Sequence, residues 1–176
     1  MKKIILVLTA LASVWGVGSW ELGAKSKEQA ATKAPPTQGS GATSEHKIVT
    51  LSDVQWADAP PSLPPGVKMA VLDGDPNKSG SFTVWLKTPA GYKIPPHTHP
   101  TTERVTGISG TARLGMGEKF DENIAKNVGP GTFVVLPANM AHFAYSAQES
   151  VVQVQSEGPF QIKYINPSED PRGEKK

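Results

Sequence analysis

A run of potential metal ligands at fixed spacing constrains this chain most strongly. Between Gly91 and Gly110 the sequence fits the pattern G-x5-H-x-H-x3-E-x6-G without a mismatch, with His97, His99 and Glu103 at its polar positions. Side chains alternate between the two faces of an extended strand, so positions 97, 99, 101 and 103 are expected on one side. Imidazole and carboxylate groups are ligands that divalent transition metals accept. The spacing therefore predicts a mononuclear metal site on β-structure.

A second segment supplies a fourth candidate ligand. Residues 131–146 nearly fit G-x5-P-x-G-x2-H-x3-N, with His142 at the histidine position. Asn139 stands where this pattern has Gly, and Ser146 stands where it has Asn. Asn is the non-glycine residue that best tolerates a left-handed backbone, so the turn is expected to survive. His46 is the only histidine outside the two patterns, and it is expected to be solvated.

Together the two segments resemble the two signature motifs of the cupin superfamily, which are small antiparallel β-barrels. The resemblance covers roughly residues 47–170 and implies an all-β domain, a single antiparallel β-barrel of the double-stranded β-helix or jelly-roll kind. It makes His97, His99, Glu103 and His142 the ligands of one divalent transition metal, which is Fe, Mn, Ni, Cu or Zn. It also implies a homodimer, because cupin barrels commonly pair through sheet edges.

Short β-type runs alternate with turn signals from residue 47 onwards. Clusters rich in Gly, Pro, Asp and Asn separate several of these runs. Many short strands without a long helical period predict an all-β barrel or sandwich. The runs expected to form strands are residues 47–51, 67–73, 81–87, 104–108, 111–116, 132–136, 142–146, 151–155 and 160–165.

Strand alternation also suggests which side chains surround the metal. We expect four residues to line the substrate pocket: Trp85, Gln153, Gln155 and Tyr164. The alternative is that these polar faces meet solvent. Residues with the parity of His142 are expected to point inward. Phe143 and Tyr145 would then point away and form a packing or dimer surface.

The first 46 residues are expected to lie outside the barrel. Lys2 and Lys3 precede an apolar stretch from residue 4 to about 17, as in a secretory signal peptide, and residues 1–19 are assigned to it. The alternative is an uncleaved N-terminal anchor. In either case the barrel is expected to be exported, to a periplasm or to the medium. Residues 20–46 are predicted to be a disordered linker and residues 171–176 a solvated tail.

Composition narrows the chemistry and the partners. Cysteine is absent, which leaves nitrogen and oxygen ligands and argues against thiol catalysis and iron–sulfur chemistry. The formal net charge of +2 includes Lys2 and Lys3, so removal of residues 1–19 would leave a neutral chain. The sequence shows no basic stripe or recognition motif for nucleic acid. A small molecule is therefore the expected partner, and no membrane contact is expected beyond the N-terminal anchor.

Three imidazoles and one carboxylate leave positions open on a five- or six-coordinate ion. Open positions are typical of catalytic or ligand-binding sites rather than structural ones. The resemblance favours a metalloenzyme of dioxygenase or oxidoreductase type acting on a small oxygenated organic molecule, with isomerase or hydrolase activity as other options. Glu103 would act as a catalytic base on leaving the metal. The alternative is a non-catalytic exported cupin that binds a metal or ligand or acts as a sensor.

Overall fold

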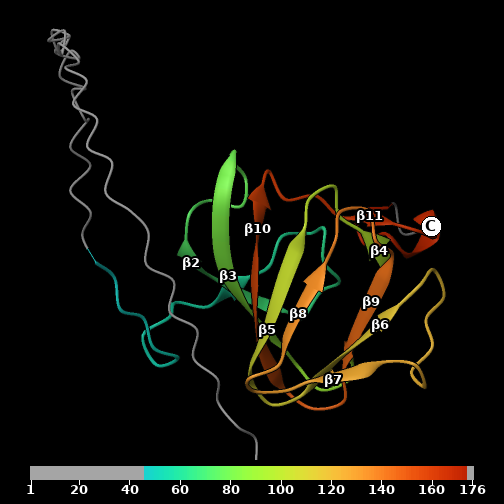
Figure 1. Cartoon of the computed structure of the whole chain (residues 1–176), viewed down its shortest axis with the longest axis horizontal. Helices are drawn as coiled ribbons and strands as arrows, with labels where there is room; N and C mark the ends of the chain where they lie inside the picture. Colours follow the sequence, from blue (N-terminus) through green and yellow to red (C-terminus); the bar gives the residue numbers. More distant parts are fainter. Residues whose placement is uncertain (1–45, 174–176) are drawn as a thin grey trace, which may run out of the picture. The chain divides into compact units, whose positions relative to one another are not determined.

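The computed structural model describes residues 46–173 (Figure 1). The predicted signal peptide or anchor (1–19), almost all of the predicted linker (20–46) and residues 174–176 of the predicted tail lie outside these residues. The described part is all-β, with eleven strands and one 3-10 helix at Pro167–Glu169. No helix in residues 46–173 has the length and apolar character needed to cross a membrane.

The strands form two antiparallel sheets. The first contains β1 (Ala57–Asp58), β2 (Lys68–Asp73), β3 (Gly80–Thr88), β5 (Glu103–Ser109), β8 (Phe133–Leu136) and β10 (Ser150–Gly158), in the order β1-β2-β3-β10-β5-β8. The second contains β4 (Tyr92–Thr98), β6 (Ala112–Met116), β7 (Lys126–Val128), β9 (His142–Ser146) and β11 (Lys163–Tyr164), in the order β11-β4-β9-β6-β7. From β3 to β6 and from β7 to β11 each strand lies in the other sheet from the one before it, so the chain crosses the fold repeatedly.

The main core lies between the two sheets. Phe82 and Val154 of the first sheet belong to the same buried apolar cluster as Leu114 and Val128 of the second. Full burial of a side chain of this size contributes roughly 1.5–3 kcal/mol, so this shared cluster is a large part of what holds the sheets together. The prediction of an all-β, jelly-roll-like fold is confirmed, as two facing sheets (Figure 1).

Seven of the nine predicted runs contain a strand with similar bounds, and two differ. The run 160–165 shortens to Lys163–Tyr164. The strand predicted at residues 47–51 is wrong. The segment is predicted as a strand from its β-forming side chains, but it pairs with no described strand. Ile48 is 83% exposed, and Asp53 closes a turn by donating its backbone N–H to the Thr50 carbonyl at 3.0 Å.

Strand β4 was not among the predicted runs, because it contains Pro95 and Pro96. Proline cannot donate a backbone hydrogen bond, so it is unfavourable inside a paired strand. The pairing of β4 with β9 is interrupted between Ile94 and His97, where the prolines lie, and resumes with His97 opposite His142. The irregularity is therefore confined to the residues that precede the candidate metal ligands.

Candidate metal centre

The four candidate ligands come from both sheets. His97 in β4 lies directly opposite His142 in β9, so backbone pairing places these two imidazoles side by side. His99 follows the end of β4, and Glu103 is the first residue of β5 in the other sheet. The parity argument for residues 97–103 assumes an extended chain, but β4 ends at Thr98 and the chain then crosses between the sheets. The structure nevertheless brings all four residues together.

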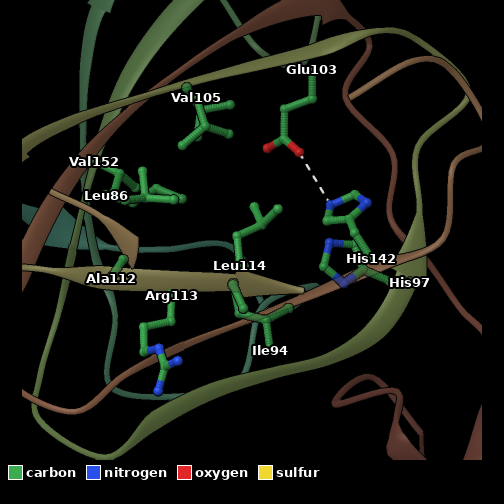
Figure 2. A pocket seen from close by; sticks show the side chains of 13 residues that line it. Leu86, Ile94, His97, Glu103, Val105, Ala112, Arg113, Leu114, His142 and Val152 are labelled. Carbon is green, nitrogen blue, oxygen red and sulfur yellow. Dashed lines mark ion pairs between the residues drawn. The ribbon is translucent and has the colours of Figure 1, made fainter. Parts of the chain in front are cut away.

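The four side chains converge inside the fold. The ligand atoms of the three histidines all lie within 4.8 Å of one another. Oε2 of Glu103 is 3.3 Å from Nε2 of His142 and 3.5 Å from Nε2 of His99, and Figure 2 shows the carboxylate facing His142. The four residues are between 2% and 7% exposed. A cluster of this kind is shielded from water and from competing ligands.

Each imidazole is fixed by a backbone carbonyl. His97 Nδ1 donates to the carbonyl of Pro95 at 2.7 Å, His99 Nδ1 to that of Gln161 at 2.7 Å, and His142 Nδ1 to that of Met140 at 2.9 Å. A carbonyl oxygen only accepts, so the proton lies on Nδ1 and the lone pair of Nε2 faces the cluster. This is the arrangement of outer hydrogen bonds that orients histidines around metals.

Two observations test whether these residues fit a metal ion. Nε2 of His99 is buried without a hydrogen-bond partner, which costs roughly 1–3 kcal/mol if nothing satisfies it. Ligand atoms that each lie about 2.1 Å from one ion are separated by about 3.0 Å at right angles and by up to about 4.2 Å at wider angles. The distances of 3.3 and 3.5 Å from Glu103 to the two histidines lie within this range. The buried histidine cluster is therefore compatible with a divalent metal site.

The protonation states also suit metal binding. Burial, with the nearby His142 and His99, lowers the pKa of His97 to about 3, and burial likewise lowers the pKa of His99. Burial alone would raise the pKa of Glu103. The contact with His142 and the proximity of the other histidines outweigh that effect, so the pKa of Glu103 lies below its ordinary value. At neutral pH His97 and His99 are therefore neutral and Glu103 is ionised, which are the forms that coordinate metals.

The segment after β10 holds His99, which lies outside any strand. The ring of Phe160 stacks on the imidazole of His99, with centroids 4.5 Å apart and planes 17° from parallel. The carbonyl of the next residue, Gln161, accepts the His99 hydrogen bond. Sequence reasoning missed both contacts, and no local pattern signals them, because about 60 residues separate the partners in the chain.

The turn before His142 adopts the conformation expected from the sequence. Asn139, at the glycine position of the second motif, has φ 63, in the left-handed region. Its backbone N–H donates to the carbonyl of His99 at 2.7 Å. The turn of the second motif therefore supports the backbone of the first motif. The expectation that the turn survives with Asn in place of Gly is confirmed.

A partly open cavity of about 60 Å³ lies between the sheets beside the cluster. His97, Glu103 and His142 form one end of its wall (Figure 2). The rest of the wall is apolar apart from the stem of Arg113, whose guanidinium points away from the cavity in Figure 2. The apolar residues are Leu86, Ile94, Val105, Ala112, Leu114, Val128, Ala144, Val152 and Val154.

The residues predicted to line the pocket lie elsewhere. Trp85, Gln153 and Gln155 alternate with the cavity residues of β3 and β10, so they point to the other face of the sheet. There Trp85 Nε1 donates to Gln153 Oε1 at 3.1 Å. Tyr164 packs beside His97, with ring centroids 5.9 Å apart, and donates its hydroxyl to the Ser62 carbonyl instead of facing the cavity. The predicted alternation of side chains along β3 and β10 is correct, but it is the apolar set, not the polar set, that faces the cavity.

Phe143 and Tyr145 point away from the cavity, as their parity predicts, and they form a packing surface. Phe143 is fully buried, and Phe120 covers both rings from the connection between β6 and β7. The Arg113 guanidinium donates to the Tyr145 hydroxyl and to the Ala125 carbonyl on this same outer face. Within the described chain this aromatic face is therefore covered and unavailable as a dimer surface.

Comparison with known proteins places the chain in a family. Residues 44–161 match the ChrR cupin-like domain. No curated protein matches the sequence. Among solved structures, the fold resembles the polyketide cyclase RemF from Streptomyces resistomycificus, with a TM-score of 0.60 and 19% identity over 72% of this chain and 90% of that chain. It also resembles a proposed acetylacetone dioxygenase from Methylibium petroleiphilum PM1, with a TM-score of 0.54 and 18% identity over 73% and 87% of the two chains.

A third similar structure is the DMSP lyase DddQ from Ruegeria pomeroyi DSS-3, with a TM-score of 0.51 and 20% identity over 70% of this chain and 64% of that chain. At such identities the structural likeness shows the fold alone. The family match is stronger, because it spans well over half of the chain and contains both motifs. The chain therefore belongs to the ChrR cupin-like family of the cupin superfamily.

Proposed function

We propose that this protein is an exported mononuclear metalloenzyme of dioxygenase or oxidoreductase type that acts on a small oxygenated organic molecule. The main support is the buried set of three imidazoles and one carboxylate beside a partly open cavity with apolar walls. Such a set leaves coordination positions free on a five- or six-coordinate ion. The adjacent cavity provides space for a substrate next to those positions.

The residues have separate roles in this proposal. His97, His99, His142 and Glu103 would hold the ion, and the backbone carbonyls behind the imidazoles would keep each Nε2 aimed at it. The bound ion would supply Lewis acidity and, if it is Fe, Mn, Ni or Cu, redox chemistry. The apolar wall would exclude water and orient the substrate in the cavity.

Glu103 has a better-supported role as a ligand than as a catalytic base. Its pKa is lowered by the histidines around it, and a carboxylate with a lowered pKa is a weaker proton acceptor at neutral pH. The other groups that line the cavity in residues 46–173 are apolar or belong to the cluster, apart from Arg113. The proposal therefore assigns proton transfer to Glu103 only when it is released from the ion.

The test is elemental analysis of the mature protein, purified from its natural location without added metal or a histidine tag. About one equivalent of Fe, Mn, Ni or Cu would support redox chemistry, and screening for oxygen uptake would follow. One equivalent of Zn would favour an isomerase, a hydrolase or a sensor. His142→Ala should lose the metal, whereas His46→Ala, at an exposed histidine, should retain it. A folded wild-type protein without metal would overturn the proposal.

A non-catalytic role in metal or ligand binding, or in sensing, is the second candidate. It is favoured by the cavity wall. Among the described residues, this wall has no acid–base group apart from the cluster and Arg113, whose guanidinium points away from the cavity. The two candidates differ in turnover: an enzyme converts a bound small molecule, whereas a sensor releases it unchanged. Export and homodimer formation belong to both candidates. They are tested by cell fractionation and by the mass of the purified protein in solution.

A further inference from the structure

The cavity beside the metal centre restricts the kind of molecule that can bind there. Side chains from both sheets, including Val105 and Val152 of the first and Ile94 and Leu114 of the second, enclose the space that Glu103 faces (Figure 2). These side chains have no hydrogen-bonding atoms. Any part of a ligand that extends away from the metal must therefore contact hydrocarbon.

Among the described residues that line the cavity, Arg113 is the only charged one outside the cluster, and its two terminal nitrogens are engaged elsewhere. Its guanidinium points out of the cavity and donates to the Tyr145 hydroxyl and the Ala125 carbonyl on the outer face of the sheet (Figure 2). The ring of Tyr145 also lies under it, 5.3 Å from the guanidinium carbon. Among the described groups, the cluster is therefore the main anchoring point for a polar ligand, and the buried Nε of Arg113 is the one other lining nitrogen without a partner.

We propose that the ligand of this site is a short, largely hydrocarbon molecule with a single polar head, such as an acid, ketone or alcohol whose tail has about two or three carbon atoms. This inference rests on the proposed function, because the head is taken to bind at the metal. The volume of about 60 Å³ is less than half of the roughly 150 Å³ in a cavity that holds benzene. A sugar or other polyol would leave buried hydroxyl groups without partners, which is strongly disfavoured.

Apolar side chains also line part of the surface outside the cavity, beside Lys126, Asn127 and Thr132. A groove between β7 and β8, the edge strands of the two sheets, shares Leu114 and Val128 with the cavity wall. Met116 and Ile124 line this groove and are 40% and 49% exposed. A hydrocarbon ligand approaching from this side meets apolar side chains both outside and inside the wall.

The test compares ligands that differ only in their tails, by calorimetric titration of the metal-loaded protein. From acetate through propanoate to butanoate, each added CH₂ group should tighten Kd by about fourfold, until the cavity is full. 3,4-Dihydroxybutanoate, which has the carbon chain of butanoate and no hydroxyl on the carbon next to the carboxylate, should bind at least about tenfold more weakly. Equal or tighter binding of the dihydroxy acid would overturn the inference.

Two variants locate the effect. Val152→Thr places a hydroxyl on the cavity wall at nearly constant volume. It should reduce the difference in Kd between butanoate and its dihydroxy analogue, which is the gap compared below. Val135→Thr makes the same change at a side chain that is 49% exposed and outside the cavity, and it should leave the gap unchanged. A gap that responds equally to both variants, or to neither, would contradict the assignment of the apolar tail to this cavity.

A measurement without metal separates this inference from the proposed function. Methyl NMR of the metal-free protein should show shifts at Leu114 and Val152 with butan-1-ol and none with butane-1,2,4-triol. If the protein takes up no metal but shows these shifts, the proposed function fails and the apolar cavity stands. If it takes up metal but prefers the dihydroxy acid and the triol, the proposed function stands and this inference fails.

Discussion

Phe160→Ala is expected to weaken metal binding through His99, a residue that no strand holds in place. The imidazole of His99 has Phe160 on one face and donates to the carbonyl of Gln161. Truncation at 160 removes the stacked ring and loosens the segment that presents this carbonyl. His99 then gains freedom to rotate away from the position in which its Nε2 faces Glu103.

The size of the effect follows from the kind of contact that is lost. Removal of an outer partner that orients a metal ligand typically lowers metal affinity by about 10–100-fold, so the Kd for the metal should rise by that factor. Truncation of a fully buried Phe costs about 3–5 kcal/mol. Phe160 is only partly buried, so the free energy of unfolding of the metal-free protein should fall by less, about 2 kcal/mol.

Phe120→Ala is the matched control. Phe120 is also partly buried, but its ring packs on Phe143, 4.8 Å between centroids, on the face of the second sheet away from His142. It should destabilise the metal-free protein to a similar extent and leave metal affinity unchanged. Urea denaturation with a chelator gives the stability of both variants, and competition with a chromophoric chelator gives their metal Kd. A Phe160→Ala protein with wild-type affinity, or an equal loss in both variants, would refute the positioning role.

Three further predictions concern the stability of the fold. The metal-free protein should lose stability as pH falls from about 6.5 towards 3. His97 and His99 have lowered pKa values in the folded protein, so the unfolded chain takes up protons on them first. Each of the two histidines should lower the free energy of unfolding by up to about 1.4 kcal/mol for each pH unit. Urea titrations at several pH values measure this slope, and His97→Ala must flatten it. Asn139→Ala should cost about 1–2 kcal/mol because φ is 63, whereas Asn139→Gly should be tolerated, as thermal unfolding would show. Gly115→Ala should destabilise by at least about 1–3 kcal/mol in the same assay, since its Cβ would overlap the buried ring of Phe143.

The metal ligands could be predicted from the sequence because their spacing is a local signal, whereas the cavity wall could not. Alternation sorts the residues of β10 into two sets, but it does not say which set faces the metal. From the sequence we expect the polar set, Gln153 and Gln155, with the alternative that this set meets solvent. In the structure Val152 and Val154 face the cavity, since the space between two sheets is also the hydrophobic core. The contact of Phe160 with His99 has no local sequence pattern that would predict it, because it depends on how distant segments of the chain pack together.

The two departures from the second motif show how the chain keeps a ligand set while its supports vary. Ser146 stands where the pattern has Asn, and its hydroxyl is 2.8 Å from that of Thr88 and 2.9 Å from that of Ser150. The Thr88 and Ser150 hydroxyls are also 2.8 Å apart, so the three buried groups close a ring. A hydroxyl both donates and accepts, so each member of such a ring satisfies its neighbours without a further partner.

This ring joins the end of β9 to β3 and β10 of the other sheet, and the Asn139 turn joins the start of β9 to His99. Both departures therefore lie at the ends of the strand that carries His142, where they fix its position relative to the other ligands. What the site requires of residues 139 and 146 is a backbone conformation and a satisfied polar contact. What it requires of 97, 99, 103 and 142 is a donor atom. A donor atom has few chemical substitutes, whereas a support has several, and the substitutions in this chain fall on the supports.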